Sequence, residues 1–182
     1  MRYVHALLPT MCAFFSMCAI GGVFYNFGTL YTLILENMSI DPTVVPFIGT
    51  LSDIIFCSLC PYGTLLTQRY GFVNSLLFGA FTMSFGLFVS SFIHEIYFWF
   101  FTYSIVLGIG FAVAYMSVVE MIYTLVPRES RSFAMGFSSG GMFIGYSIFA
   151  PLLLELESSI GLWSAIVTIC LLFEYVETFF HN

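Results

Sequence analysis

The sequence Arg131-Ser-Phe-Ala-Met-Gly136-Phe-Ser-Ser-Gly-Gly141-Met-Phe-Ile-Gly145 places a cation directly before an apolar run that contains several glycines. Gly141 and Gly145 are four residues apart, so they share one face of a helix. Small residues at this spacing let a second helix approach closely inside a membrane. The segment therefore predicts a membrane helix that packs tightly against a neighbour.

The composition of the whole chain agrees with this interpretation. Of its 182 residues, 60% are hydrophobic and 8% are charged, and the mean hydropathy is +1.00. Soluble domains carry about 25% charged residues, so an ordinary soluble fold is excluded. A helix needs roughly 20 apolar residues to cross about 30 Å of hydrocarbon. We expect an all-α polytopic membrane protein, one domain of residues 1–182, with six spans at about 7–35, 44–67, 72–93, 96–126, 132–154 and 160–180.

The charges predict how these spans are oriented. The chain has no lysine, and its arginines fall in alternate gaps between the apolar runs, at Arg2, Arg69, Arg128 and Arg131. Loop cations concentrate on the cytosolic side of membrane proteins. We therefore expect both termini and the gaps 68–71 and 127–131 to be cytosolic. The glycosylation sequon Asn37-Met-Ser39 then lies on the outer side, close to the membrane.

Glycines also interrupt the first span of each predicted triplet of helices. Gly21, Gly22 and Gly28 lie in the first span, and Gly108 and Gly110 lie in the fourth. Glycine permits close packing or local unwinding of a membrane helix. Matching interruptions in two triplets favour a three-plus-three inverted repeat.

Two segments in the cytosolic gaps carry a family resemblance. Gly63-Thr-Leu-Leu-Thr-Gln-Arg69-Tyr-Gly71 resembles a loop motif of the major facilitator superfamily, with Gln68 in place of the usual acid. Physically, glycine allows a tight turn and arginine can bond to helix-end carbonyls. The segment 131–145 resembles the fifth-helix motif of the monocarboxylate transporter family, and Arg131, Ala134, Gly136, Gly141 and Gly145 match it without a gap. Pro61 and the segment Asn26-Phe-Gly-Thr-Leu-Tyr31 also fit that family.

The resemblance implies a carrier of the major facilitator fold, of which this chain is the N-terminal six-helix half. It implies transport of a small organic solute, monocarboxylate-like or related, by symport and alternating access. Proton-coupled carriers of lactate-like acids have a lysine at the position of Tyr25, and this chain has no lysine elsewhere. The alternative is a truncated, non-transporting membrane protein that associates with full-length transporters.

Several polar residues inside the spans are candidates for the solute or proton pathway. Asp53 lies near the middle of the second span, where an ionisable group is by default a functional candidate. The other interpretation is an acid hydrogen-bonded to a neighbouring helix. Tyr25, Asn26 and Tyr115 are candidate solute contacts, although tyrosine is as often a packing residue.

Glu120 lies near the cytosolic end of the fourth span. It is a candidate for a gating network with Arg69, Arg128 or Arg131, and snorkelling to the interface is the simpler account.

Other function classes find no support in the sequence. The five cysteines lie within spans, where cysteine behaves as a small hydrophobe, and Cys57-Ser-Leu-Cys60 is read in that way. We find no nucleophile–base arrangement, phosphate loop or metal-ligand spacing, so we expect no enzyme, cofactor or metal site. The expected partners are the lipid bilayer, a small solute, a second six-helix half or second copy, and a single-span accessory protein. Nucleic acid is not expected, and the expected location is the plasma membrane.

Overall fold

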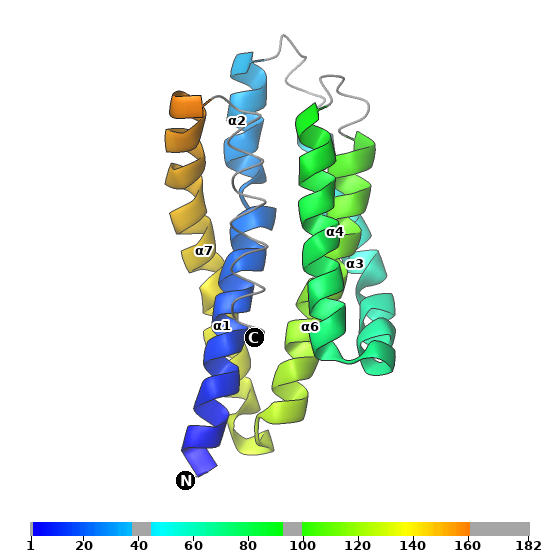
Figure 1. Cartoon of the computed structure of the whole chain (residues 1–182), viewed down its shortest axis with the longest axis vertical. Helices are drawn as coiled ribbons and strands as arrows, with labels where there is room; N and C mark the ends of the chain where they lie inside the picture. The colour runs from blue at the N-terminus through cyan, green and yellow to red at the C-terminus, as the bar shows by residue number, and fades with distance from the viewer. Residues whose placement is uncertain (1, 38–44, 93–99, 161–182) are drawn as a thin grey trace.

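The structure is a computed structural model that describes residues 2–37, 45–92 and 100–160. Its elements are α1 (Arg2–Phe24), α2 (Phe27–Asn37), α3 (Val45–Tyr70), α4 (Phe72–Phe92), the π-helix η1 (Phe100–Leu107), α6 (Gly108–Leu125), the short 3-10 helix η2 (Arg128–Ser130) and α7 (Arg131–Ile160). No strand occurs in these ranges. The helices run up and down as one bundle (Figure 1).

Five segments are long and apolar enough to cross a membrane: Leu7–Thr32, Pro46–Tyr70, Phe72–Ser90, Phe101–Leu125 and Arg128–Glu155. They correspond to the first five predicted spans, and α1 and α2 together form the first of them. The predicted sixth span, 160–180, falls almost entirely outside the described residues. The N-terminus, the α3–α4 turn and the α6–α7 connection lie at one end of the bundle (Figure 1), so Arg2, Arg69, Arg128 and Arg131 share that end.

The first span is interrupted where α1 ends and α2 begins, and Asn26 closes the interruption. Its side-chain amide donates to the carbonyl of Gly22 at 2.6 Å, and its own carbonyl accepts from the backbone N–H of Leu30 at 3.1 Å. The Thr29 hydroxyl donates to the Asn26 side-chain oxygen at 3.2 Å. Backbone groups freed at a break in a membrane helix need such partners because lipid offers none.

The fourth span is irregular at its beginning, where η1 precedes α6. Hydroxyl groups attach this π-helical segment to two neighbouring helices: Ser104 donates to the Ile48 carbonyl of α3 at 2.8 Å, and Ser90 of α4 donates to Thr102 at 2.8 Å. Single π-helical segments inside longer helices are rare and frequently mark functional sites. Spans one and four are therefore both irregular, although Gly108 and Gly110 themselves lie within the regular helix α6 and not in the π-helical segment.

Glycines set the closest helix contacts, as the segment 131–145 predicts. A Cβ on Gly145 of α7 would overlap the carbonyl oxygen of Cys18 in α1, and one on Gly141 would come within 2.5 Å of the Phe14 carbonyl oxygen. On the other side of the contact, a Cβ on Gly21 would come within 2.7 Å of the Met142 Cα. The α1–α7 contact thus depends on the absence of side chains on both helices.

A second glycine contact joins α3 to α6, where a Cβ on Gly63 would lie 2.9 Å from the Ala112 carbonyl oxygen. In a three-plus-three inverted repeat, span one corresponds to span four and span five corresponds to span two. The contact between α1 and α7 (spans one and five) therefore corresponds to the contact between α6 and α3 (spans four and two). This pairing accords with the expected inverted repeat. The repeat stays a prediction because its sixth span is not described.

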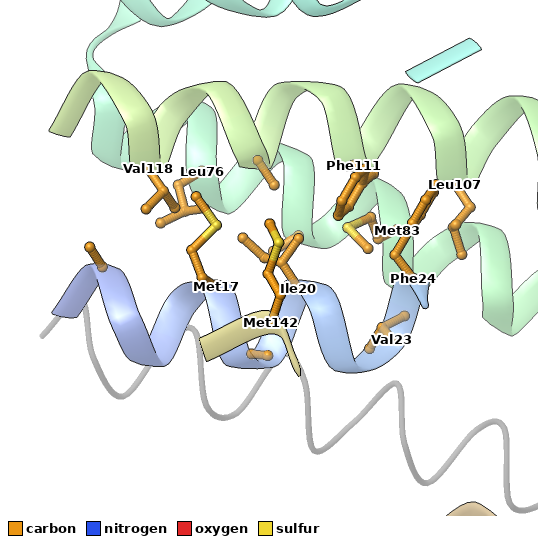
Figure 2. Close-up of a cluster of buried hydrophobic side chains, with 14 of the residues drawn as sticks. Met17, Ile20, Val23, Phe24, Leu76, Met83, Leu107, Phe111, Val118 and Met142 are labelled. Carbon is orange, nitrogen blue, oxygen red and sulfur yellow. The ribbon is translucent and has the colours of Figure 1, made fainter. Parts of the chain in front are cut away.

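Apolar side chains from α1, α4 and α6 fill the centre of the bundle. Figure 2 shows Met17 and Ile20 of α1 directed toward Phe111 and Val118 of α6, with Leu76 and other residues of α4 beside them.

At the arginine end, Gly71 joins α3 to α4 with φ of +86°, and its N–H donates to the Thr67 carbonyl at 2.9 Å. This left-handed conformation closes the turn that the loop motif predicts.

Candidate functional site

A pocket of about 350 Å³ opens where the break in the first span meets the beginning of α3 and the π-helix η1. Asp53 of α3 and Tyr25 of the break line it and are not covered by the rest of the chain, and Tyr103 of η1 lines it from a buried position. The remaining lining residues are Phe24, Phe27, Gly28, Tyr31, Pro46, Gly49, Thr50 and Ser52. The pocket thus combines one carboxylate with several aromatic rings.

The irregular backbone of two spans positions these side chains. Phe27, the first residue of α2, packs against Tyr103 with ring centroids 5.3 Å apart. Tyr103 stands between Thr102 and Ser104, the two residues whose hydroxyl bonds attach η1 to its neighbours. The hydrogen bonds that hold the π-helix therefore also hold the pocket wall.

An aromatic cluster continues from the pocket along the bundle, and its members are Phe24, Tyr25, Phe56, Phe111 and Tyr115. Phe24 stacks on Phe111 with centroids 3.8 Å apart and planes at 8°. Phe111 also contacts Phe56 at 4.6 Å, and Phe56 meets Tyr115 edge-on at 5.6 Å. The cluster links α1, α3 and α6 along the side of the bundle that carries the pocket.

The structure brings together some of the predicted pathway residues and separates others. Tyr25 and Asp53 line the same pocket, and Tyr115 connects to it only through the aromatic cluster. Asn26 does not line this pocket. It is buried beside a smaller pocket formed with Leu30, Leu87 and other residues, where its side chain closes the helix break.

Asp53 lies eight residues after Val45 (53 − 45), which is about 12 Å along the helix. The middle of α3 falls between residues 57 and 58, so Asp53 lies closer to the middle of the helix, about 7 Å away, than to its beginning. Arg69, in the last turn of the same helix, lies sixteen residues further on (69 − 53), or about 24 Å. Asp53 thus lies well away from the end of the bundle that carries the arginines.

The motif residues take distinct positions in the connections and contacts. Arg131 donates from Nε to the Val126 carbonyl at 3.0 Å and places its guanidinium 5.4 Å from the Tyr123 ring centroid, so it caps α6. We expected carbonyl capping at Arg69, but its guanidinium lies over the adjacent Tyr70 ring at 5.7 Å. Gly136 is exposed, and a Cβ there would meet nothing within 4 Å.

The predicted gating network is not assembled in this conformation. Glu120 is half-buried on α6, and within the described ranges no ion pair joins it to Arg69, Arg128 or Arg131. Pro61 lies inside α3 at an exposed position. Asn37 is the last residue of α2.

Cys57 and Cys60 of α3 are free thiols, as are Cys12 and Cys18. Among residues 2–37, 45–92 and 100–160, no group of three or more His, Cys, Asp or Glu side chains is arranged to hold a metal ion.

Sequence reasoning missed Tyr103, Phe27 and Tyr31 as pocket residues. Phe27 and Tyr31 lie in the segment that resembles the family's first helix, so that resemblance was a usable signal. No signal in the sequence pointed to Tyr103 as a pocket residue. A π-helix changes which residues of a span face inward, and hydropathy does not predict where a π-helix occurs.

Comparisons with known proteins agree with the fold. The family model of the Major Facilitator Superfamily matches residues 13–177, so the chain belongs to this superfamily, whose members are polytopic membrane proteins. Within it, the chain is monocarboxylate-transporter-like. It is 31% identical to Monocarboxylate transporter 9 of Pongo abelii over 135 residues, which is 74% of this chain and 26% of that protein.

Two further relatives show the same pattern. Monocarboxylate transporter 9 of Gallus gallus is 29% identical over 135 residues, and Monocarboxylate transporter 7 of Homo sapiens is 21% identical over 140 residues. These matches cover 74% and 77% of this chain but 26% and 27% of the relatives. The chain thus spans about a quarter of the length of the curated relatives it matches.

Proposed function

We propose that this chain forms one six-helix half, residues 1–182, of a carrier that moves a small organic solute across a membrane by alternating access. The observation that carries the proposal is the exposed carboxylate of Asp53, placed in a membrane span beside a pocket with Tyr25 and Tyr103. Tyr25, Asp53 and the aromatic cluster through Tyr115 are the proposed solute or proton pathway.

One exposed acidic residue within the span distinguishes α3 from α4, and this difference supports the assignment. On α4, Phe78, Phe81 and Phe85 are 54%, 61% and 52% exposed, and an apolar face of this kind suits lipid. On α3, the exposed carboxylate of Asp53 is poorly suited to lipid, because charged groups in spans face the protein interior or a water-filled cavity. We therefore assign the side of Asp53 to the cavity.

The position of the pocket supports alternating access. In many transporters the solute site lies at the interface of two repeats, and it is formed by discontinuous helices that rock around it. Here the first and fourth spans, the two irregular ones, meet at the pocket, and the exposed Asp53 and Tyr25 leave it open on one side. A second six-helix half, or a second copy of this chain, would close that side.

Fusion to a second half tests the proposal. The chain alone is compared with the chain joined to the part of Monocarboxylate transporter 9 that follows the matched region, using uptake of a panel of labelled small solutes. We expect no uptake by the chain alone and uptake of at least one solute by the fusion. Asp53→Asn should abolish that uptake, whereas Thr82→Ala, which removes a polar side chain from α4 outside the pocket, should leave it unchanged.

Two outcomes would contradict the proposal. Uptake by the purified monomeric chain in liposomes would show that no second half is needed. Co-purification with full-length transporters, together with no uptake by any fusion, would favour the non-transporting alternative instead.

The motif residues have proposed roles in this carrier. The end of the bundle with Arg69, Gly71, Glu120 and Arg131 is proposed to meet the second half and control opening on the cytosolic side. The charge distribution supports cytosolic termini, and Asn37 is the proposed glycosylation site. The plasma membrane and a single-span accessory protein are proposed from the resemblance to the monocarboxylate transporter family. Epitope tags at both termini, stained with and without permeabilisation, test the orientation.

A further inference from the structure

We propose that the pocket at Asp53 binds an alkylated ammonium group, so that the solute carries a positive charge on the part that enters this half. The inference rests on the proposed function, since it names the chemical class of solute for the same pocket. Its grounds are the sign of the charge in the pocket, the aromatic lining and the distance to every arginine.

The charge near the pocket is negative. Asp53 is the one charged side chain that lines it. Arg69 lies about 24 Å further along the same helix. Arg2 begins α1, about 35 Å along the first span from Tyr25 (25 − 2 residues). Because Arg128 and Arg131 lie at the same end as these two arginines, an anionic solute would meet a carboxylate here and no guanidinium.

The remaining walls of the pocket suit an alkylated cation. Five of the lining residues are aromatic: Phe24, Tyr25, Phe27, Tyr31 and Tyr103. Aromatic faces attract cations by about 0.5–1 kcal/mol at exposed sites and about 2 kcal/mol or more where water is excluded, and aromatic cages recognise quaternary ammonium groups. The volume of about 350 Å³ is at the lower end of the range for small-molecule sites, about 300–1,000 Å³.

The break in the first span adds to the same preference. Asn26, the polar side chain that could offer amide N–H groups to an anion, donates instead to the Gly22 carbonyl and faces the smaller pocket. In the pocket at Asp53, the polar lining side chains are the tyrosines, Thr50, Ser52 and the carboxylate itself. The Thr50 and Ser52 hydroxyls donate to carbonyls of their own helix, so they are not free to donate to an anion.

Three probes of similar branched shape and different charge test the inference: tetramethylammonium, the neutral tert-butanol and the anionic pivalate. Their binding to the purified chain in detergent is followed by saturation-transfer NMR on the methyl signals. This readout does not require transport, so it separates the inference from the proposed function. We expect tetramethylammonium to bind most tightly.

Matched variants locate the binding. Asp53→Asn should weaken tetramethylammonium binding about tenfold. Glu129→Gln, which removes an equal charge from the exposed helix η2 outside the pocket, should leave that binding unchanged. Tyr25→Ala should weaken it about threefold or more, as expected for loss of one cation–aromatic contact, whereas Tyr62→Ala, on the exposed surface of α3 outside the pocket, should not.

The results separate the possible failures. Tighter binding of pivalate than of tetramethylammonium would overturn the cationic assignment while leaving a solute pocket in place. Equal effects of Asp53→Asn and Glu129→Gln, or no binding of tetramethylammonium, would also overturn it. Failure of the proposed function would instead appear as fusions that transport nothing although tetramethylammonium binding depends on Asp53.

Discussion

Replacing Gly145 by alanine tests the helix contact on which the fold depends. A Cβ at this position would overlap the Cys18 carbonyl oxygen and lie 2.8 Å from the Cys18 carbonyl carbon. Ordinary van der Waals contact begins near 3.4 Å, and backbone atoms of a packed helix cannot rotate away as a flexible side chain can. The two helices must therefore separate or shift along their length.

Overpacking typically destabilises by about 1–3 kcal/mol, and a clash with main chain belongs at the upper end. Alanine returns up to about 1 kcal/mol through its better helix propensity. We therefore expect Gly145→Ala to destabilise by about 2 kcal/mol. At roughly 2–4 °C per kcal/mol for a chain of this length, the melting temperature should fall by about 4–8 °C.

Gly136 and Gly140 of the same helix provide the controls. A Cβ on either meets nothing within 4 Å, so Gly136→Ala and Gly140→Ala should be neutral or slightly stabilising. The melting temperature of each purified variant in detergent is measured by size-exclusion chromatography with fluorescence detection after heating to a series of temperatures. Equal melting temperatures for Gly145→Ala and Gly136→Ala would refute the close α1–α7 contact.

Two further changes have matched controls in the same assay. Gly71→Ala forces alanine into a left-handed conformation at φ of +86°, so it should destabilise the protein by about 1–2 kcal/mol. Gly28→Ala should not destabilise it, since a Cβ on Gly28 meets nothing within 4 Å. A Gly71→Ala variant as stable as the wild type would mean that the α3–α4 turn has another conformation. Ser104→Ala removes the hydrogen bond that attaches η1 to α3 and should destabilise by about 0.6 kcal/mol, up to about 1.7. Ser147→Ala should have no measurable effect because that hydroxyl bonds only within its own helix, and equal melting points for the two serine variants would argue against an attached π-helix.

The sequence predicted the structure best at positions where a close helix contact or a positive φ requires glycine. Gly141 and Gly145 predicted a close helix neighbour, and the structure identifies it as α1. Gly71 predicted a tight turn, and the structure gives it a positive φ. Apolar length predicted the first five spans because a membrane helix satisfies its backbone internally whatever its neighbours are.

Side-chain roles were harder to predict because they depend on which way an irregular helix turns. Asn26 belongs to a recognisable motif, but its partners across the break could not be known without the geometry. The π-helix at Phe100–Leu107 brings Tyr103 to the pocket wall, and a regular helical period does not predict that position. Arg69 and Arg131 looked equivalent as loop cations, yet only the second caps a helix.

The proposed carrier requires that the side of the bundle with Asp53 faces water while α4 faces lipid. Cysteine accessibility measures this directly, because a thiol reacts as the thiolate, which requires contact with water. In the fusion to a second half, with the native cysteines replaced and expressed in cell membranes, Asp53→Cys and Tyr25→Cys are compared with Phe81→Cys and Phe85→Cys, using a charged, membrane-impermeant methanethiosulfonate added from outside. We expect rapid labelling of the first pair and little labelling of the second. Equal or reversed rates would contradict the proposed carrier.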